Sequence, residues 1–399
     1  MQIGFVRAAV VLGLLAVVGP FAIDLYLPAT PQIVQDLQTD DAGAHLTFTV
    51  YFIAFGVAQL VYGPIADWLG RKPPIFMGLV VFIIGSIICA QADDIFALTL
   101  GRFVQALGAA APMVIVRAVV RDLHTGTQAT RLMALVMLVI SISPLLAPLT
   151  GSFIIDFGSW RLIFWVLAVI ALAAMLLTAF QLPETLAPDR RVGIDAKALL
   201  GSAIFLLRDF KFMGLTLISG FSLASFFVFI ASAPMVYMSH YALTPKEFSL
   251  VFALGAIGFF GASQFAASLG QKYGMARAAL WATLGFASAT SLLFVLVWLG
   301  QDHLAILMSL LFVGNTCLGL VIAPTMVMAL EEHGEHAGMA SSLGGTLQMV
   351  AGGLMILVCS PFFDRTPLPL VGAVAVCAVT AFVLALLTLR PEPEGTATA

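Results

Sequence analysis

Two charged residues lie inside long apolar stretches of this sequence. Asp24 ends an apolar run that begins after Arg7, and Arg102 follows Asp94 within another apolar stretch. A charge at the centre of a membrane-spanning helix costs about 2.5–3.5 kcal/mol on insertion scales, so embedded charges are functional candidates. A carboxyl near a guanidinium can load or release a proton when their separation or water access changes. The pair predicts proton coupling. The structural alternatives are an interfacial helix cap for Asp24 and a backbone anchor for Arg102.

Helix geometry places the two charges at similar depths. At about 1.5 Å per residue, Asp24 lies about 25 Å beyond Arg7 along a helix, and Arg102 lies about 12 Å from Asp94. Since Arg7 and Asp94 are expected on opposite membrane surfaces, both charges fall in the outer half of the membrane. We therefore expect Asp24 and Arg102 to meet across a cavity, where each lowers the desolvation cost of the other.

The composition identifies the solvent that surrounds these residues. Of the 399 residues, 61% are hydrophobic and 10% are charged, against roughly 25% charged in soluble proteins. Such a chain cannot cover its apolar surface in water, which excludes a soluble monomer. The net charge of −3 provides no basic field for nucleic acid. The four cysteines lie in apolar stretches without CxxC pairs, which indicates neither a disulfide framework nor a zinc site.

Charges and polar clusters divide the chain into twelve apolar stretches of membrane-spanning length. Backbone groups in lipid must bond to one another, and the alternation of a β-barrel is absent, so these stretches are expected to be helices in an all-α membrane protein. The expected spans are 8–29, 46–66, 74–92, 95–117, 131–155, 161–182, 212–236, 248–270, 277–300, 304–330, 337–362 and 367–389.

The distribution of basic residues predicts the orientation. With twelve spans, fourteen of the eighteen lysines and arginines fall on the side of both termini, three fall on the opposite side, and Arg102 is embedded. The positive-inside rule then places both termini in the cytoplasm. The N-terminal apolar run superficially resembles a signal peptide, but no small-residue cleavage site follows it, so we expect an uncleaved first span.

A long polar segment at 183–211 divides the spans into two sets of six. We expect an N-terminal half at 1–182, a cytoplasmic linker at 183–211, and a C-terminal half with a short tail at 212–399. A faint repeat supports this division, because Pro28 and Gly70 recur about 205 residues later as Pro234 and Gly274. Parallel six-span repeats with binding between the halves are one transporter plan. Chance agreement in an apolar sequence is the alternative.

The loop between the second and third spans carries a dense set of small and charged residues. Glycines let helix ends approach closely, Asp67 can bond to a helix N-terminus, and Arg71 can pair with a carboxylate such as Asp122. This set, here the latch cluster, would hold the cytoplasmic side shut in one of two states. A tight turn with positive-inside charges is the alternative reading. The latch cluster comprises Gly63, Asp67, Gly70, Arg71, Lys72, Arg121 and Asp122.

The fifth span contains Pro144, Pro148 and Gly151. Two prolines remove two backbone donors and bend the helix, while small residues permit close helix contact. A bent, tightly packed helix suits a hinge or a seal between the halves. A kink without a mechanical role is the alternative.

Polar and aromatic residues within the spans are candidates for a substrate cavity, although most aromatic residues are expected to face lipid. The expected cavity residues are Asp24, Tyr26, Gln105, Phe226, Phe229, Asn315 and Gln348. The acidic and histidine-rich segment at 331–336 lacks a second set of ligands and is expected to be a solvated loop. We expect no metal and no cofactor, with a proton gradient as the driving force.

Several motifs resemble the major facilitator superfamily, and within it the twelve-span drug:proton antiporters. The segment from Gly63 to Lys72 is similar to the loop motif G-x-L-a-D-r-x-G-r-k, and Leu98 to Ala110 is similar to the motif of the fourth span. The resemblance implies a major facilitator fold and assigns Arg102 to proton coupling. The fifth span keeps Pro148 and Gly151 of the antiporter motif but replaces its other glycines.

A finer resemblance is to the Bcr/CflA branch of bacterial inner-membrane drug exporters. It is carried by IDLYLPATP, RAVVRDL, SPLLAPLTG, SWRLIFW, LPET and AGMASSLGGTLQ. The resemblance implies an exporter of small lipophilic or amphiphilic compounds, such as bicyclomycin or amphenicols, against proton entry. We expect it to act as a monomer. A proton-coupled uptake symporter or a metabolite exporter of the same fold is the alternative. A membrane enzyme is disfavoured because no nucleophile–base pair or ligand cluster shares one depth.

Overall fold

The computed structural model describes residues 4–331, 333 and 336–389 of the chain. In this part of the chain no strand occurs, and twelve helical stretches are long and apolar enough to cross a membrane. The expected all-α membrane fold with twelve spans is therefore confirmed. Six of the twelve spans extend several residues beyond their expected ends, because polar residues at the membrane surface continue the helices, and the other six end within about two residues of the expected positions.

The chain order of the elements is simple, and each expected span corresponds to one long helix or to a helix with a break. The first part of the chain forms α1 (Phe5–Asp24), η1 (Leu27–Ala29), α2 (Thr30–Asp36), α3 (Asp41–Leu69), α4 (Lys72–Ala90), α5 (Ile95–Leu123), α6 (Gly126–Phe157), α7 (Arg161–Gln181) and η2 (Pro188–Arg190). The second part forms α8 (Ala196–Arg208), α9 (Phe210–Met235), η3 (Val236–His240), α10 (Pro245–Ser263), α11 (Ala266–Tyr273), α12 (Met275–Trp298), α13 (Leu304–Glu331), α14 (Ala337–Cys359), η5 (Ser360–Phe362) and α15 (Pro367–Thr388).

The first span is interrupted directly after Asp24. The sequence predicts one continuous helix over 8–29, but α1 ends at Asp24 and the span continues as η1 and α2 to Asp36. Pro28 in η1 has no backbone N–H and cannot continue the ladder of α1. The break leaves the last carbonyls of α1 without helical partners inside the bundle. A hydrogen-bond donor from another helix is therefore needed at the end of α1, and the candidate functional site provides one.

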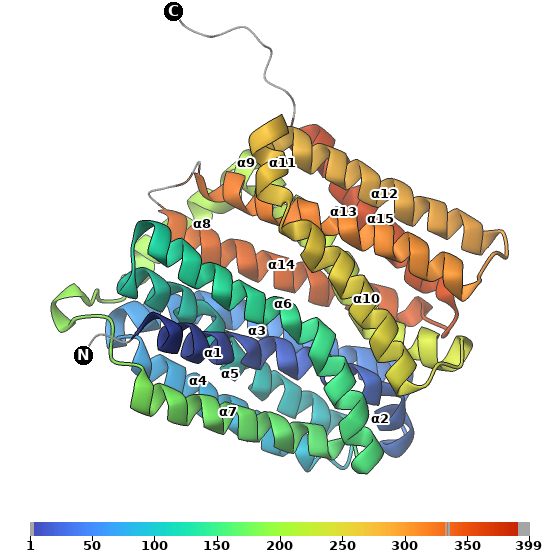
Figure 1. The fold of residues 1–399 in the computed structure, drawn as a ribbon, viewed down its shortest axis with the longest axis horizontal. Coiled ribbons are helices and arrows are strands. Elements are labelled where there is room, and N and C mark those ends of the chain that lie inside the picture. Colours follow the sequence, from blue (N-terminus) through green and yellow to red (C-terminus); the bar gives the residue numbers. More distant parts are fainter. Residues whose placement is uncertain (1–3, 332, 334–335, 390–399) are drawn as a thin grey trace, which may run out of the picture.

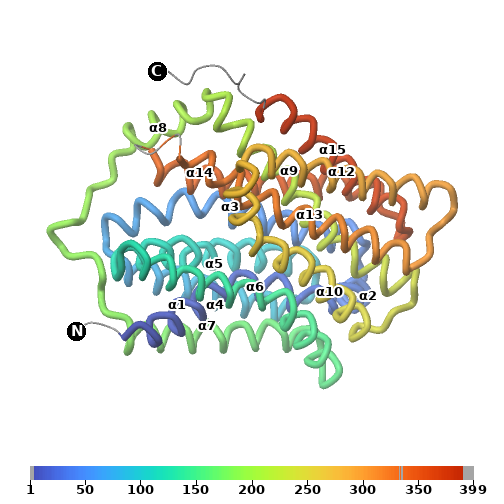
Figure 2. Tube along the Cα trace, turned by 45° about the horizontal axis from the view of Figure 1, so that its top comes forward, coloured from blue at the N-terminus to red at the C-terminus, as the bar shows by residue number. Residues whose placement is uncertain are grey.

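The helices form two groups that lie side by side. Figure 1 shows α1–α7 in its lower part and α9–α15 in its upper part, and the tube in Figure 2 shows the same separation. The groups meet chiefly where α3 packs on α14 and α6 packs on α10. Gly70 and Gly274 end corresponding helices and both have positive φ, 99° and 86°. The boundaries expected for the halves, 1–182 and 212–399, stay a prediction.

The two ends of the bundle differ. The end that carries Arg71, Lys72 and α8 is here named the basic end. At the opposite end, polar contacts join the two halves. Asp41 accepts two hydrogen bonds from Arg365, at 2.7 and 2.8 Å, and these bonds raise the pKa of the Arg365 guanidinium. In the same region His45 Nδ1 lies 3.1 Å from Ser360 Oγ. The opposite end is therefore closed in this conformation.

The polar segment at 183–211, which the sequence predicts as a linker, contains the helix α8. Asp195 caps it by accepting hydrogen bonds from the backbone N–H groups of Lys197 and Ala198. Leu206 is buried, whereas Leu200 and other apolar side chains of α8 are exposed. A sequence reading based on charge and proline missed this helix because one short amphipathic turn pattern is a weak signal.

Glycines permit very close packing of α4 on α5. A Cβ atom at Gly108 would lie 2.3 Å from the backbone nitrogen of Phe82, whereas a Cβ atom at Gly63 would meet nothing within 4 Å. We expect Gly108→Ala to lower the melting temperature of the purified protein, because overpacking costs about 1–3 kcal/mol. Thermal unfolding in detergent checks this.

Gly63→Ala is the matched control, because it adds the same methyl group to a helix without a clash. Alanine is favoured over glycine inside a helix by about 0.5–1 kcal/mol, so its melting temperature should stay level or rise. Equal destabilisation by the two substitutions would contradict the packing shown here.

Candidate functional site

Asp24 is the last residue of α1 and is only 4% exposed. Its carboxyl accepts a hydrogen bond from Ser143 Oγ, at 3.0 Å, and Ser143 belongs to α6. A hydroxyl can donate to a carboxylate and can accept from a protonated carboxylic acid. Ser143 can therefore bond to Asp24 in both protonation states of the carboxyl. Protonation of Asp24 breaks no ion pair among the described residues.

Arg102 on α5 is completely buried and binds the end of α1. Its Nη1 donates to the carbonyl of Ala22, at 2.8 Å, and to Oε1 of Gln105, at 2.7 Å. Gln105 in turn donates to Ser86 Oγ at 2.8 Å. A cation is favourable at a helix C-terminus, where carbonyls lack partners. Arg102 thus supplies the donor that the break after Asp24 requires.

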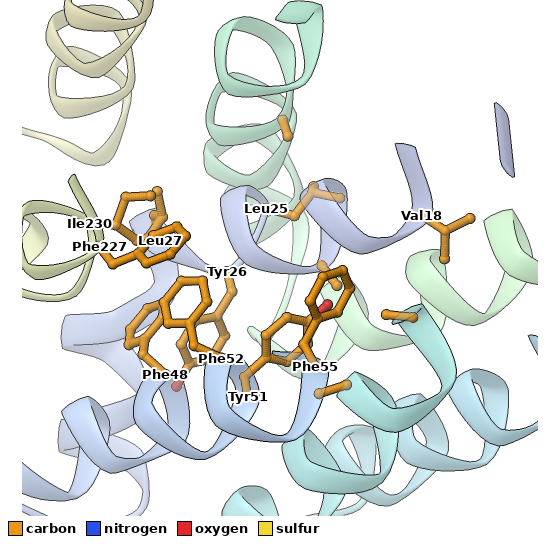
Figure 3. Packing of buried hydrophobic residues seen from close by; sticks show 14 of the residues in the cluster. Val18, Leu25, Tyr26, Leu27, Phe48, Tyr51, Phe52, Phe55, Phe227 and Ile230 are labelled. Carbon is orange, nitrogen blue, oxygen red and sulfur yellow. The ribbon is translucent and has the colours of Figure 1, made fainter. Parts of the chain in front are cut away.

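Two tyrosine rings enclose the Arg102 guanidinium. Its Cζ atom lies 4.2 Å from the ring centroid of Tyr51 and 4.8 Å from that of Tyr26. Figure 3 shows both tyrosines beside the end of α1, with Tyr51 on α3. Their hydroxyls bond elsewhere, Tyr51 to the carbonyl of Gly19 and Tyr26 to Thr47. Cation–π contacts of this kind replace part of the hydration that a buried guanidinium loses.

The expected Asp24–Arg102 pair is not formed in this conformation. Among the described residues, the hydrogen-bond partner of Asp24 is Ser143, while Arg102 binds Ala22 and Gln105. The reason is the end of α1, which turns Asp24 towards α6 and presents the Ala22 carbonyl to α5. The two charges still share one structural element, because both act on the last turn of α1.

The bent helix α6 connects the end of α1 to the second half. Pro144 and Pro148 lie inside α6. Close to them, a Cβ atom at Gly151 would lie 2.3 Å from the carbonyl oxygen of Leu25, which leaves room only for glycine. The Pro148 carbonyl accepts a hydrogen bond from Ser249 of α10, at 2.9 Å. The three expected residues of this span therefore lie between the Asp24 break and the other half.

The latch cluster is centred on Arg71, whose side chain is largely buried. Arg71 pairs with Asp122 at 2.7 Å, the partner expected from the sequence, and with Asp67 at 2.6 Å. Burial lowers the pKa of Arg71, but the hydrogen bonds that its guanidinium donates to these two carboxylates outweigh burial and raise that pKa. Thr185 also donates to Asp122, at 3.0 Å. The cluster fastens the α3–α4 turn to the end of α5.

Other members of the latch cluster differ from their expected roles. Gly70 has φ of 99°, which favours glycine, whereas Gly63 lies inside α3 with open space around it and makes no close approach. Lys72 Nζ donates to the carbonyl of Ala179. Arg121 forms no hydrogen bond or ion pair with any residue that the structure describes. Among the described residues, the latch cluster therefore joins elements of the first half to one another and to the start of the segment 183–211.

Glu184 contacts the latch cluster, although the sequence analysis does not single it out. Its carboxylate accepts hydrogen bonds from the backbone N–H groups of Arg71, at 2.8 Å, and Lys72, at 3.0 Å. These N–H groups are at the start of α4, where a negative charge is favourable. Glu184 belongs to the LPET segment, so the motif was visible, but its contact across more than a hundred residues was not. Ser143 was missed as the partner of Asp24 for the same reason.

A cavity of about 650 Å³ lies near the basic end, between the two halves. Residues of α3, α5 and α6 line one side, and residues of α13, α14 and the segment 192–199 line the other. Four members of the latch cluster line it, namely Gly63, Asp67, Arg71 and Arg121, but none of the residues expected for the substrate cavity does. The lining places this cavity on the basic side of the bundle centre, whereas the opposite end is closed.

The residues expected for a substrate cavity are packed instead in this conformation. Gln348 donates to Ser219 Oγ at 2.9 Å, beside a very small void. Phe226 stacks on Phe259, and Phe229 stacks on Phe252. The remaining expected residues are buried, Asn315 near Gly255 and the others around Arg102. Their cavity role stays a prediction for another conformation.

Aromatic rings fill the centre of the bundle where the two halves meet. Phe52 of α3 stacks on Phe227 of α9, with ring centroids 4.0 Å apart and planes inclined by 23°. Figure 3 shows this pair beside Tyr26, Phe48 and Tyr51. Because this stacked pair joins α3 to α9, it would have to separate when the opposite end opens.

The structure offers no cluster of three or more metal-ligating side chains among its described residues. In the segment 331–336, which the sequence predicts as a solvated loop, residues 332, 334 and 335 lie outside the described residues. His333 is buried, and its Nδ1 lies 3.0 Å from the Ala329 carbonyl. That histidine departs from the expected solvated loop.

Comparison with known proteins gives a consistent result across the chain. The sequence is 32% identical over 395 residues to the uncharacterized MFS-type transporter YdgK of Bacillus subtilis, covering 97% of this chain and 96% of YdgK. It is 30% identical over 373 residues to a bicyclomycin resistance protein homolog of Haemophilus influenzae, covering 92% of each chain. The fold is similar to that of a D-xylose-proton symporter, with a TM-score of 0.74 at 15% identity, covering 98% of this chain and 99% of the symporter. The sequence model of the Major Facilitator Superfamily matches residues 12–356. With twelve spans in two groups of helices and these relatives along its length, the chain belongs to the major facilitator superfamily of membrane transporters.

Proposed function

We propose that this transporter exports drugs or other small lipophilic or amphiphilic compounds by alternating access, driven by proton entry. The observation that carries the proposal is the carboxyl of Asp24, buried at a helix break and bonded to the hydroxyl of Ser143. A buried acid whose partner accepts both protonation states is suited to carry a proton through the bundle. Arg102 holds the end of α1 on which Asp24 lies.

Proton binding at Asp24 would act on the rest of the bundle through α6. Protonation allows the Asp24–Ser143 hydrogen bond to reverse its direction, because a carboxylic acid can donate where a carboxylate only accepts. The same helix packs on the α1 break at Gly151 and bonds to α10 through Pro148. A shift of α6 would therefore change the contact between the halves at the closed end. An equilibrium between two packed arrangements is what alternating access requires.

The comparisons and the charge distribution support further parts of the proposal. A relative that is 30% identical is named a bicyclomycin resistance protein homolog. We therefore place bicyclomycin-like or amphenicol-like compounds among the candidate substrates. By the positive-inside rule, we place the basic end and both termini in the cytoplasm. We further propose that the protein acts as a monomer in a bacterial inner membrane. Protons, lipids and a small-molecule substrate are its partners, without a cofactor.

Transport by purified protein in proteoliposomes tests the proposal. The substrate is radiolabelled bicyclomycin or chloramphenicol. When a proton gradient is imposed, we expect wild type to move the drug in the direction opposite to the protons. We expect Asp24→Asn to lose this proton-driven transport. Asparagine has nearly the same shape and can still bond to Ser143, but it cannot bind and release a proton. Drug movement down its own gradient in the variant would show that it is folded.

Asp93→Asn is the matched control, because Asp93 is an exposed acid at the opposite end and its substitution should leave proton-driven export unchanged. Proton-driven export that survives in Asp24→Asn would contradict the proposal. Drug movement in the same direction as the protons would favour the alternative, an uptake symporter, and resistance of cells to neither drug would favour a metabolite exporter of the same fold.

A further inference from the structure

Two hydrogen-bond donors without partners line the cavity at the basic end. Nε of Arg117 and Nε2 of Gln59 are buried and have no hydrogen-bond partner in the part of the chain that the structure describes. Arg117 lies on α5 and Gln59 on α3, so the donors reach the cavity from two helices. Buried donors are satisfied in more than about nine cases in ten. Two exceptions around one cavity point to an acceptor that enters it.

The charges around this cavity favour an anion. Arg121 lies one helical turn after Arg117 and also lines the cavity, and neither guanidinium has an ion-pair partner among the described residues. Like charges four residues apart on a helix repel each other. The acidic residues of the lining are already engaged, Asp67 by Arg71 and Asp195 by the start of α8. A bound anionic group would therefore reduce the repulsion between Arg117 and Arg121, which no acidic residue of the described lining neutralises.

The rest of the lining fits an apolar body. Val114, Ile115 and Met133 line the same side as the two arginines, and Leu330 and Met339 line the side of the second half. The volume of about 650 Å³ lies within the range of ligand sites for drug-sized molecules. Guanidinium groups bind carboxylates through paired hydrogen bonds, which favours a carboxylate over a neutral carbonyl.

We infer that Arg117, with Gln59 and Arg121, forms a subsite for amphiphilic organic carboxylates on the basic side of the transporter. The subsite lies fifteen residues along α5 from Arg102, about 22 Å at the rise of an α-helix. It is therefore distinct from the proton site at the α1 break. The inference names a substrate class for the proposed exporter and rests on that proposal for transport, but binding at the subsite needs no gradient.

Binding of a matched pair of probes to the full-length protein in nanodiscs tests the subsite. The probes are 9-anthracenecarboxylate and its neutral analogue 9-anthracenecarboxamide, titrated at pH 7 without a proton gradient. We expect wild type to bind the carboxylate about tenfold or more tightly than the carboxamide, since one charge-assisted hydrogen bond changes affinity by that factor or more. In Arg117→Gln this preference should fall to near one, and in Arg117→Lys part of it should remain.

Arg190→Gln is the matched control, because it removes the same charge from the basic end at an exposed position of η2 that does not line the cavity. Its preference for the carboxylate should equal that of wild type. Without probe, Arg117→Gln should melt no lower than wild type, since the substitution removes a guanidinium that is bonded to none of the described residues. Lower melting without probe would indicate a structural anchor and overturn the subsite.

Equal binding of the two probes by wild type, or a preference that persists in Arg117→Gln, would also overturn the inference. The same titration with Asp24→Asn separates this test from that of export. Carboxylate binding by that variant at wild-type strength is expected even if proton-driven export proves absent, because the subsite and the proton site share no residue.

Discussion

Replacing Arg102 by leucine is expected to reduce proton-driven export by a factor on the order of 100, with little change in thermal stability. The guanidinium holds the Ala22 carbonyl at the end of α1, and Asp24 lies two residues further on. Without this donor the end of α1 loses its fixed position, and misplacement of a reacting group by about 1 Å costs on the order of 100-fold in rate. Drug transport into everted membrane vesicles measures the effect.

Two opposing terms keep the expected stability change small. Loss of hydrogen bonds to a charged group costs about 1.5–3 kcal/mol each, but removal of a buried charge recovers several kcal/mol of desolvation. Arg102→Lys should recover part of the transport, since an ammonium can reach Ala22 but cannot lie as a plane between the rings of Tyr26 and Tyr51.

Arg131→Leu is the control for Arg102→Leu. Arg131 is exposed at the basic end, and its guanidinium lies over the ring of Phe5. Its export should stay close to wild type. Export by Arg102→Leu at the wild-type rate, with equal amounts of protein in the membrane, would show that neither the helix end nor the guanidinium contributes to coupling.

The second large effect concerns the latch cluster. We expect Asp122→Ala to lower the free energy of unfolding by about 3 kcal/mol, because it leaves the buried guanidinium of Arg71 with Asp67 as its remaining carboxylate. A double-mutant cycle with Arg71→Ala should give a coupling energy of about 1.5–3 kcal/mol, since each residue loses its effect once the other is absent. Chemical unfolding in mixed micelles measures all four variants.

The pair of Lys246 and Asp156 provides a matched cycle. It also joins a cation to a carboxylate at short distance, but the side chains are 50% and 46% exposed. Exposed pairs contribute about 0–1 kcal/mol, so the coupling of this cycle should be smaller than that of the latch cluster. Equal coupling in the two cycles would mean that burial does not strengthen the Arg71–Asp122 pair.

The proposed proton site at Asp24 and the proposed carboxylate subsite at Arg117 lie apart in the bundle. The α1 break brings Asp24 to α6, and α6 reaches the second half through Pro148 and Ser249. The cavity lies towards the basic end, and its described lining includes none of Asp24, Arg102 and Ser143. Proton binding and substrate transport would then be coupled through the packing of helices, which switches between two arrangements.

The number of spans and the all-α architecture could be predicted from the sequence alone. Lipid fixes both, because an apolar stretch of about 20 residues must form a helix to satisfy its backbone. The pairing of Arg71 with Asp122 was also predictable, since both belong to short charged segments expected at one membrane surface. Embedded charges such as Asp24 and Arg102 were visible for the same reason, because the cost of burying a charge makes each one stand out.

The partners of those charges were decided by the tertiary structure. The sequence predicts that Asp24 meets Arg102, but the end of α1 turns the carboxyl to Ser143 and presents the Ala22 carbonyl to the guanidinium. Hydrophobic patterning fixes the depth of a residue in the membrane but not the direction in which it points after a helix break. Neutral partners such as Ser143 give no signal of their own, because a serine in a span costs little. The sequence by itself therefore determined where charge is buried, and only the packing of helices distant in the chain decided what each charge binds.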